Sequence, residues 1–369
     1  MHQTHNLQQR MRLFNSIFLP ILIYQLANFS ASFVDTTMTG QYDTLHLAGV
    51  SMATSLWIPF FDLLIGIVSA LVPIIGHHLG QEKKEKIASD FYQFIYLSLG
   101  LSLILFALVF VGAPLVLSHL GLEPLVEEVA KNYLWYLALG IIPLLLFSTI
   151  RSLFDALGLT KLSMYLMLLL LPLNGTFNYA LIYGAFGFPE MGGAGAGLGT
   201  SLAYWVLLLI SLLVAAKHPK IRAYELWKIR SLDKKGLIEG VRLGLPIGGT
   251  FFAEVVIFSV VGLVMAKFSS LIIASHQAAM NFSNLMYAFP MSISTSMSII
   301  VSYEIGANRP DDVKEFCKLG RLTALGIAGF TFLFLYILRD RVAALYGSDA
   351  EFIRMTSVFL TYSLFFQLA

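Results

Sequence analysis

Three acidic residues stand inside long apolar stretches of this sequence. Asp35 lies near the end of the run 13–39, and Glu254 lies in the middle of 239–266. A charge inside a membrane-spanning helix costs roughly 2.5–3.5 kcal/mol on insertion scales, so such residues are functional candidates by default. We therefore predict that Asp35 and Glu254 bind a cation, a proton or a charged ligand. The alternative is a structural acid bonded to polar groups of a neighbouring helix. The third acid, Asp62, is flanked by bulky apolar residues, and its role is left open.

Polar side chains in later segments complement Asp35. Asn174 and Asn178 are four residues apart in the run 161–187, which puts both amides on one helix face. This segment would run through the membrane in the direction opposite to the first, so Asn178 is expected at a depth similar to Asp35. Carboxylate and amide oxygens suit a hard cation such as Na⁺, and a lone carboxylate could carry H⁺ instead. Thr200 could add a hydroxyl to this site. The alternative is polar contact between helices.

The composition indicates a polytopic membrane protein. The chain has 369 residues, of which 57% are hydrophobic and 12% charged, whereas soluble domains average about 25% charged. A net charge of +2 gives no argument for a nucleic-acid partner. The single cysteine, Cys317, excludes a disulfide within the chain and offers no metal cluster. The polar start runs into an apolar segment too long for a signal peptide, so none is expected.

Hydropathy predicts ten apolar segments of spanning length, and Lys and Arg predict their orientation. With the N-terminus in the cytoplasm, 19 of the 24 Lys and Arg fall on the inner side and 5 on the outer. We therefore expect a multi-pass protein of the cell membrane with a cytoplasmic N-terminus. The predicted segments are 13–39, 45–75, 90–112, 130–152, 161–187, 192–216, 239–266, 270–303, 317–338 and 352–369.

An internal repeat indicates the architecture. Identical residues recur at an offset of 226 over more than a hundred positions; the pairs are Pro20 and Pro246, Ala48 and Ala274, Gly80 and Gly306, Gly121 and Gly347, and Tyr136 and Tyr362. Each repeat contains an even number of helices, so both run the same way through the membrane. The sequence predicts an all-α fold of two six-helix bundles related by a pseudo-two-fold about the membrane normal. Tyr136 is taken as a further candidate binding residue.

The repeat also divides the chain. Residues 1–216 are predicted to form an N-terminal six-helix lobe, 217–238 a cytoplasmic linker, and 239–369 a C-terminal lobe. A complete second bundle would end near 216 + 226 = 442, so the C-terminal lobe is expected to be incomplete, with helices seven to part of ten. The basic linker is predicted to be a solvated loop. The alternative is an amphipathic helix on anionic lipid.

Several runs resemble the multidrug and toxic compound extrusion (MATE) family, in its NorM-like branch, and the resemblance covers essentially the whole chain. They are FVDTTMTG, LAGVSMATSLWIPF, RSLFDALGLTK, LPLNGTFNYALIYG and GFPEMGGAGAGLGTSLAYW in the first half, and GLPIGGTFFAE, IIASHQAAMNF and YEIGAN in the second.

The resemblance implies a fold and an activity. Members export cationic, often aromatic drugs in exchange for Na⁺ or H⁺, and two six-helix lobes alternate around a central cleft. Asp35, with Asn174 and Asn178 beside it, matches the cation site of the N-terminal lobe. Glu254 matches the acid of helix seven, and a further acid is expected in helix ten beyond the last residue. The implied partners are small organic cations and the lipid bilayer, with no resident cofactor, no nucleic acid and a monomeric state.

Two other functions are weighed against export. A lipid-linked oligosaccharide flippase of the same superfamily would need a cationic cleft to hold pyrophosphate, whereas the buried charges here are negative. An intramembrane enzyme would need paired aspartates, a Ser–Lys or Ser–His couple, or a zinc motif, and the apolar segments contain none. We therefore expect a transporter and not an enzyme. Na⁺ and H⁺ are equally compatible with the residues.

Overall fold

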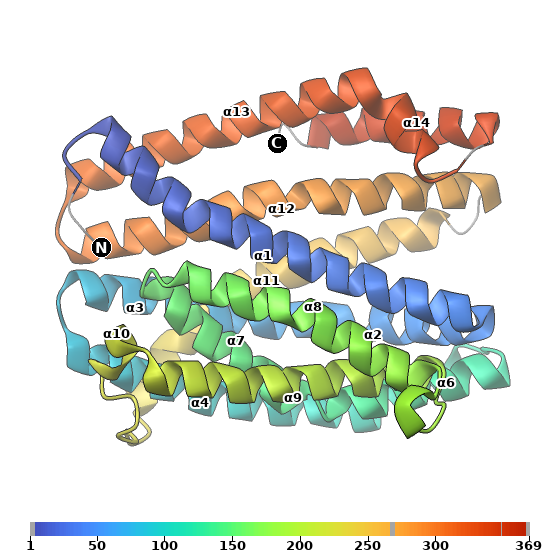
Figure 1. Cartoon of the computed structure of the whole chain (residues 1–369), viewed down its shortest axis with the longest axis horizontal. Helices are drawn as coiled ribbons and strands as arrows, with labels where there is room; N and C mark the ends of the chain where they lie inside the picture. The colour runs from blue at the N-terminus through green and yellow to red at the C-terminus, as the bar shows by residue number, and fades with distance from the viewer. Residues whose placement is uncertain (1–3, 266–269, 348, 367–369) are drawn as a thin grey trace.

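Helices are the only regular elements in the part of the chain that its computed structural model describes, residues 4–265, 270–347 and 349–366 (Figure 1). The all-α prediction is therefore confirmed. The helices are α1 (Leu7–Tyr42), α2 (Thr44–Ser69), α3 (Leu71–Gly80), α4 (Lys84–Ala107), the π-helix η1 (Leu108–Gly112), α5 (Ala113–His119), α6 (Pro124–Ala138), α7 (Ile141–Ala156), α8 (Thr160–Ile182), the 3₁₀ turn η2 (Ala185–Gly187), α9 (Gly193–Lys217), α10 (Pro219–Arg222), α11 (Lys234–Met265), α12 (Ser270–Gly306), α13 (Pro310–Ala344) and α14 (Ala350–Phe366).

Eight helices of the described chain are long and apolar enough to cross a membrane, where the sequence predicted ten. In two of them, consecutive elements form one span: α2 with α3, and α4 with η1 and α5. The predicted segment 130–152 is instead the pair α6 and α7, bent by 49° at a short break, which would make a ninth. The break contains Gly140, where the backbone packs directly against Ser201 of α9. The tenth segment, α14, has 17 described residues, and the end of the predicted range lies outside them.

The helices form two groups, as the two-bundle prediction requires (Figure 1). In the first group, α1 packs against α8, and both α8 and α6 pack against α9. The helix α2 packs against α6. In the second, α12, α13 and α14 pack on one another. The groups meet where α11 lies along α2, and where α12 contacts both α3 and α1. Most of the buried apolar side chains form one large cluster centred on the first group, and a smaller cluster lies in the second.

The meeting of α3 and α12 reproduces the repeat found in the sequence. A side chain on Gly80 would strike the backbone of Tyr303 and Gly306, and a side chain on Gly306 would strike the backbone of His77. Residues 77 and 303 are 226 apart, as are 80 and 306. The contact is therefore reciprocal, as a two-fold axis between the helices produces. Backbones approach this closely only at residues without a side chain. We call the contact of Gly76, His77 and Gly80 with Ser302, Tyr303 and Gly306 the glycine seam.

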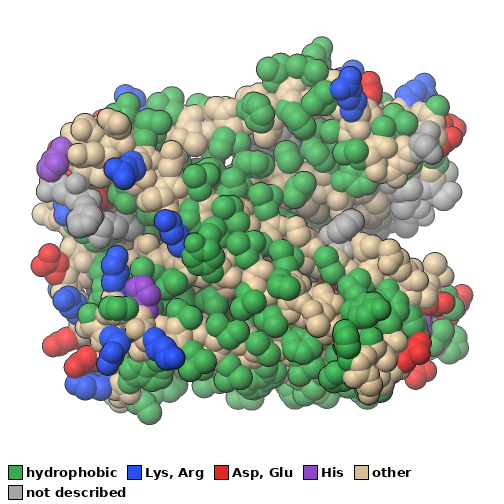
Figure 2. All heavy atoms as spheres, in the orientation of Figure 1, with side chains coloured by type: hydrophobic (Ala, Val, Ile, Leu, Met, Phe, Trp, Pro, Cys, Tyr) green, Lys and Arg blue, Asp and Glu red, His purple; other side chains and the backbone are tan. Residues whose placement is uncertain are grey.

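The two ends of the molecule differ. The seam lies at the end that carries the N-terminus and α10, which we call the α10 end (Figure 1). At this end Arg10 of α1 also forms ion pairs with Asp312 at 2.8 Å and Glu315 at 3.5 Å, both on α13. At the opposite end the surface is hollowed between the two groups of helices (Figure 2). The structure is therefore closed at the α10 end and open at the other.

Candidate functional site

Asp35 of α1 is joined to α8 and α9 by a chain of hydrogen bonds. The Asn178 amide nitrogen donates to the Asp35 carboxylate and also to the Asn174 amide oxygen, the latter at 3.2 Å. The Asn174 amide nitrogen in turn donates to the Thr200 hydroxyl at 3.0 Å. The structure thus brings together Asp35, Asn174, Asn178 and Thr200, four of the predicted site residues, from three helices. We call this group the Asp35 cluster.

Small residues of α9 make room for the cluster. A side chain on Gly199 would strike the Asn178 amide oxygen, and one on Gly195 would strike the backbone of Leu181. Glycine at these positions lets α9 approach α8 closely, because small residues at a helix contact allow the two backbones to come together. The approach brings the Thr200 hydroxyl within reach of Asn174. The glycines therefore position the polar groups, although they contribute no ligand atom themselves.

The cluster contains oxygen atoms that could bind a further ligand. Asn174 and Asn178 are buried, and within the described part of the chain the Asn178 amide oxygen has no hydrogen-bond partner. Leaving a buried acceptor unpaired costs about 1–3 kcal/mol. Asp35 is partly exposed, and it takes part in none of the ion pairs formed by the described residues. An accessible carboxylate beside an unpartnered amide oxygen is suited to receive a small cation.

The ligand set is sparse in carboxylates. No three His, Cys, Asp or Glu side chains gather into a possible metal site in the described part of the chain. A cation at the predicted ligands Asp35, Asn174 and Asn178 would meet one carboxylate together with amide and hydroxyl oxygens. Hard cations take such oxygen ligands. The donor set therefore fits a singly charged ion or a proton carried as cargo.

Two tyrosines near Asp35 were not singled out by the sequence. Tyr133 of α6 and Tyr204 of α9 both interact electrostatically with Asp35. The predicted Tyr136 lies three residues further along α6, where its backbone carbonyl accepts a hydrogen bond from the Ser201 hydroxyl at 2.7 Å. No interaction of Tyr136 with Asp35 is found among the described residues. The signal in the sequence that could have identified Tyr133 was its position, about one helical turn before the predicted residue Tyr136.

A second buried acid of the first bundle was also missed. Asp155, near the end of α7, is 3% exposed and accepts a hydrogen bond from the Tyr24 hydroxyl at 3.3 Å. The Arg151 guanidinium stacks over the Tyr24 ring at 5.2 Å and interacts electrostatically with Asp155. Tyr204 interacts with both Arg151 and Asp35. In the sequence, Arg151 and Asp155 stand four residues apart at the end of the predicted segment 130–152, and this spacing was the signal that could have identified the pair.

Glu254 belongs to a separate group between α11, α12 and α2. Its carboxylate accepts a hydrogen bond from the Tyr287 hydroxyl at 3.1 Å. Asp62 lies on α2, which packs along α11, and is close enough to Glu254 for the two charges to repel each other. Glu254 and Tyr287 line a cavity of about 250 Å³, together with His276, Asn284, Tyr362 and several apolar side chains. No contact between Glu254 and Asp35 is found among the described residues.

Known proteins share both the sequence and the fold. The protein-family model MatE matches residues 20–180 and again 246–369. The two matches begin 226 residues apart, at the offset of the internal repeat. A relative from Streptococcus pneumoniae R6, described as a probable multidrug resistance protein NorM, is 70% identical over all 369 residues and 82% of its own length. A protein of the same description from Bacillus subtilis is 38% identical over all of this chain and 82% of its own length.

Solved structures agree in fold at lower sequence identity. An outward-facing multidrug resistance MATE family transporter of the MOP superfamily superposes with a TM-score of 0.85 at 18% identity, covering 100% of this chain and 82% of its own. The eukaryotic MATE transporter AtDTX14 gives a TM-score of 0.84, covering 98% of this chain and 81% of its own at 18% identity. With the family model matching most of the residues and relatives matching the whole length, the chain belongs to the multidrug and toxic compound extrusion (MATE) family, as its sequence motifs predicted.

Proposed function

We propose that the chain is a cation-coupled antiporter that exports organic cations in exchange for Na⁺ or H⁺. The family consists of multidrug efflux transporters, so the chain is a transporter and not an enzyme, and it needs no resident cofactor. Membership of the family does not by itself identify the coupling ion or the charge of the exported compound. The observation that carries them is the Asp35 cluster, a partly exposed carboxylate that has no ion-pair partner among the described residues and lies beside an amide oxygen that has no hydrogen-bond partner among them.

Exchange follows from competition for this carboxylate. A small cation bound at Asp35 neutralises the charge and gives the Asn178 amide oxygen a partner. A ligand can shift a conformational equilibrium only by its different affinity for the two states. A cation that binds Asp35 more tightly in one state thus favours that state, and its release favours the other. The membrane potential adds about 2.3 kcal/mol per elementary charge for every 100 mV.

The charge around the second group favours a cationic cargo. Glu254 and Asp62 lie on opposite sides of the meeting of the bundles, and Tyr287 places an aromatic ring beside Glu254. A carboxylate with aromatic neighbours attracts organic cations through charge and through the ring face. The same two acids would repel the pyrophosphate of a lipid-linked oligosaccharide, so the flippase alternative has less support.

The arrangement in the cell is part of the proposal. The distribution of Lys and Arg supports a cytoplasmic N-terminus in the plasma membrane, which would make the closed α10 end the cytoplasmic one. Residues 1–216 and 239–369 would be the two lobes, joined by the cytoplasmic linker 217–238. We take the functional unit to be a monomer, because both candidate groups lie within one chain.

Dye efflux from everted vesicles tests the coupling. A Na⁺ gradient and a pH gradient are imposed separately on vesicles that contain the protein, its Asp35→Asn variant or its Asp311→Asn variant. Asp311 is an exposed acid at the start of α13, so its variant is a matched control. We expect one gradient to drive efflux, the Asp35→Asn variant to lose that dependence, and the Asp311→Asn variant to keep it. Efflux that neither gradient drives, or coupled efflux by the Asp35→Asn variant, would refute the proposal.

A further inference from the structure

The segment between the bundles is attached to α4 through its backbone. The Tyr92 hydroxyl donates to the carbonyl of Leu226 at 2.6 Å, and the Tyr96 hydroxyl donates to that of Arg230 at 2.8 Å. Between them, Gln93 donates to the carbonyl of residue 231 and accepts from the backbone N–H of residue 233. The Leu226 side chain is buried in the large apolar cluster. The segment is therefore an ordered part of the fold.

Three large apolar side chains of this segment face away from the protein. Trp227 is 59% exposed, Ile229 79% and Leu232 52%. The backbone carbonyls of residues 226, 230 and 231 are bonded to α4, while these three side chains remain exposed. Exposed apolar groups so close together in the sequence indicate a surface that is covered in the working protein.

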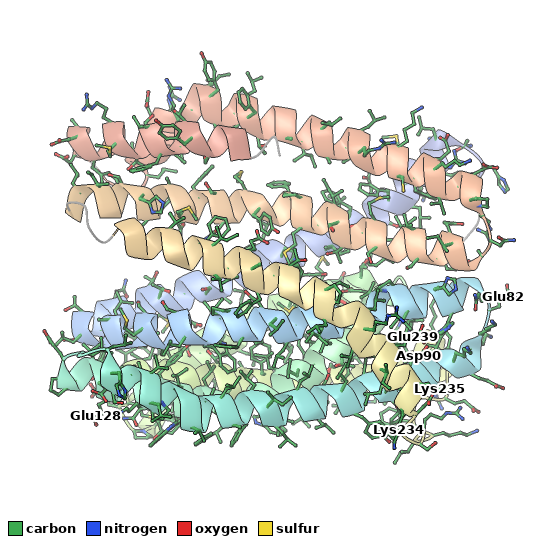
Figure 3. The ribbon with its side chains drawn as sticks, turned by 180° about the vertical axis from the view of Figure 1, so that it is seen from behind. Glu82, Asp90, Glu128, Lys234, Lys235 and Glu239 are labelled. Carbon is green, nitrogen blue, oxygen red and sulfur yellow. The ribbon has the colours of Figure 1, made fainter. Side chains whose placement is uncertain are left out.

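Basic residues surround these apolar side chains. Residues 217–235 contain seven Lys and Arg against two acids, Glu225 and Asp233. Blue Lys and Arg side chains gather at the α10 end in Figure 2. Figure 3 shows Lys234 and Lys235 extending away from the ribbon near the start of α11. Lys228 pairs with Glu225 at 2.8 Å. Lys234 and Lys235 form no ion pair with any of the described residues.

The position along α4 places the segment at the membrane surface. The continuous span Lys84–His119 has 36 residues, which gives a length of about 54 Å at about 1.5 Å per residue. The apolar core of a bilayer is about 30 Å thick, so about 12 Å, or eight residues, extend beyond it at each end of a centred helix. Tyr92 lies eight residues after Lys84, at the boundary where tyrosine and tryptophan concentrate in membrane proteins.

We propose that residues 226–235 form a membrane-surface anchor that binds anionic phospholipids. Trp227, Ile229 and Leu232 enter the boundary between headgroups and acyl chains, while Lys234 and Lys235 meet the negative headgroups. The apolar side chains supply the depth and the basic side chains supply the preference for anionic lipid. The choice of the cytoplasmic leaflet rests on the proposed orientation. The anchor would fix the linker on the lipid surface while the two bundles move.

A labelled variant tests the anchor in the full chain. Cys317 is the only cysteine, so Cys317→Ser with Ile229→Cys accepts a single bimane fluorophore. The protein is placed in phosphatidylcholine vesicles that contain phosphatidylglycerol, and either lipid is brominated to the same bromine content. Brominated lipid quenches a fluorophore that it touches. Two triple variants are compared: Lys220, Lys234 and Lys235→Gln in the linker, and Lys83, Lys84 and Lys86→Gln in the neighbouring loop as the matched control.

We expect brominated phosphatidylglycerol to quench the label more strongly than brominated phosphatidylcholine. One basic side chain near an anionic surface contributes about fivefold to binding. The linker variant should therefore lose at least about fivefold of the preference, while the loop variant keeps it. Equal quenching by both lipids, or equal loss in both variants, would overturn the anionic-lipid assignment. A label that neither brominated lipid quenches would indicate a solvated loop or a protein partner. This result would also overturn the proposed membrane anchor.

The orientation is read separately. A membrane-impermeant thiol reagent should label Ile229→Cys only from the cytoplasmic side of sealed vesicles. Labelling from the outer side would overturn the placement in the cytoplasmic leaflet. These measurements need neither a drug nor an ion gradient, so their outcome is independent of whether the efflux experiment succeeds.

Discussion

Adding one methyl group to the glycine seam is expected to open the α10 end. In Gly306→Ala the new carbon would overlap the carbonyl oxygen of His77, its nearest neighbour, and would also lie 2.8 Å from the His77 carbonyl carbon, where ordinary contact begins at 3.4 Å. Relieving the contact with the carbonyl carbon alone requires α3 and α12 to separate by 3.4 − 2.8 = 0.6 Å, and relieving the overlap with the oxygen requires more, unless the backbone distorts. Overpacking of this kind costs about 1–3 kcal/mol. Because α3 and α12 belong to different bundles, the penalty applies to the state in which the bundles meet.

The expected change in the population of the closed state follows from this free-energy penalty. A cost of about 1–3 kcal/mol on the closed state lowers its population relative to a separated state by about 5- to 150-fold. The repeat supplies an internal check, since Gly80→Ala places a carbon 2.6 Å from the Ala307 nitrogen and 2.8 Å from the Gly306 carbonyl carbon. Both single variants should therefore shift the equilibrium in the same direction and by a similar amount.

The assay is the rate at which a buried thiol is modified. Ser302→Cys in a Cys317→Ser background places a thiol in the seam, because Ser302 is 8% exposed and packs against Gly76. An impermeant reagent added at the α10 end should react faster in the alanine variants, in proportion to the separated state. Gly326→Ala on α13 is the control, since a side chain there would meet no atom within 4 Å. Unchanged rates in both seam variants of folded protein would refute the assignment of the seam as a closing contact.

Other substitutions test the interior of the first bundle. Gly199→Ala should displace the Asn178 amide and lower ion-coupled efflux by at least about tenfold, the equivalent of one hydrogen bond to a charged group; Gly249→Ala, where a side chain meets nothing within 4 Å, should leave efflux unchanged. Asp155→Ala removes the acceptor of the buried Tyr24 hydroxyl and should destabilise the protein by about 1–3 kcal/mol. Thermal unfolding in detergent measures this loss, and an unchanged melting temperature would show that the hydrogen bond contributes little.

Residue spacing was sufficient to predict the Asp35 cluster and the two bundles. The four-residue separation of Asn174 and Asn178 placed both amides on one face, and the structure joins Asn178 to Asp35. The offset of 226 predicted two equivalent bundles, and Gly80 meets Gly306 at their contact. Both inferences used spacing along a regular helix or along a repeat, which the sequence records directly.

The tyrosines and Asp155 depended on information that spacing does not contain. Helices buried in lipid are apolar all round, so their sequence gives little indication of which face points inward. Tyr133 and Tyr136 were therefore indistinguishable until the rotation of α6 was known. Asp155 lies close to Arg151 and to the end of its helix, a pattern also expected of a loop. The break between α6 and α7 was missed for a related reason, because an apolar run looks the same whether it is straight or bent.

The candidate cation site and the glycine seam lie on helices that contact each other. Asp35 lies on α1, and α1 contacts α12, which forms one half of the glycine seam. The Asn178 bond ties the part of α1 far from the α10 end to α8 of the first bundle, while Arg10 near the start of α1 pairs with Asp312 of the second bundle at 2.8 Å. A change in the charge of Asp35 therefore acts on a helix that is attached to both bundles. A rigid α1 would transmit such a change to the seam directly, and a helix that bends at Pro20 would confine it to the half of α1 that contains Asp35.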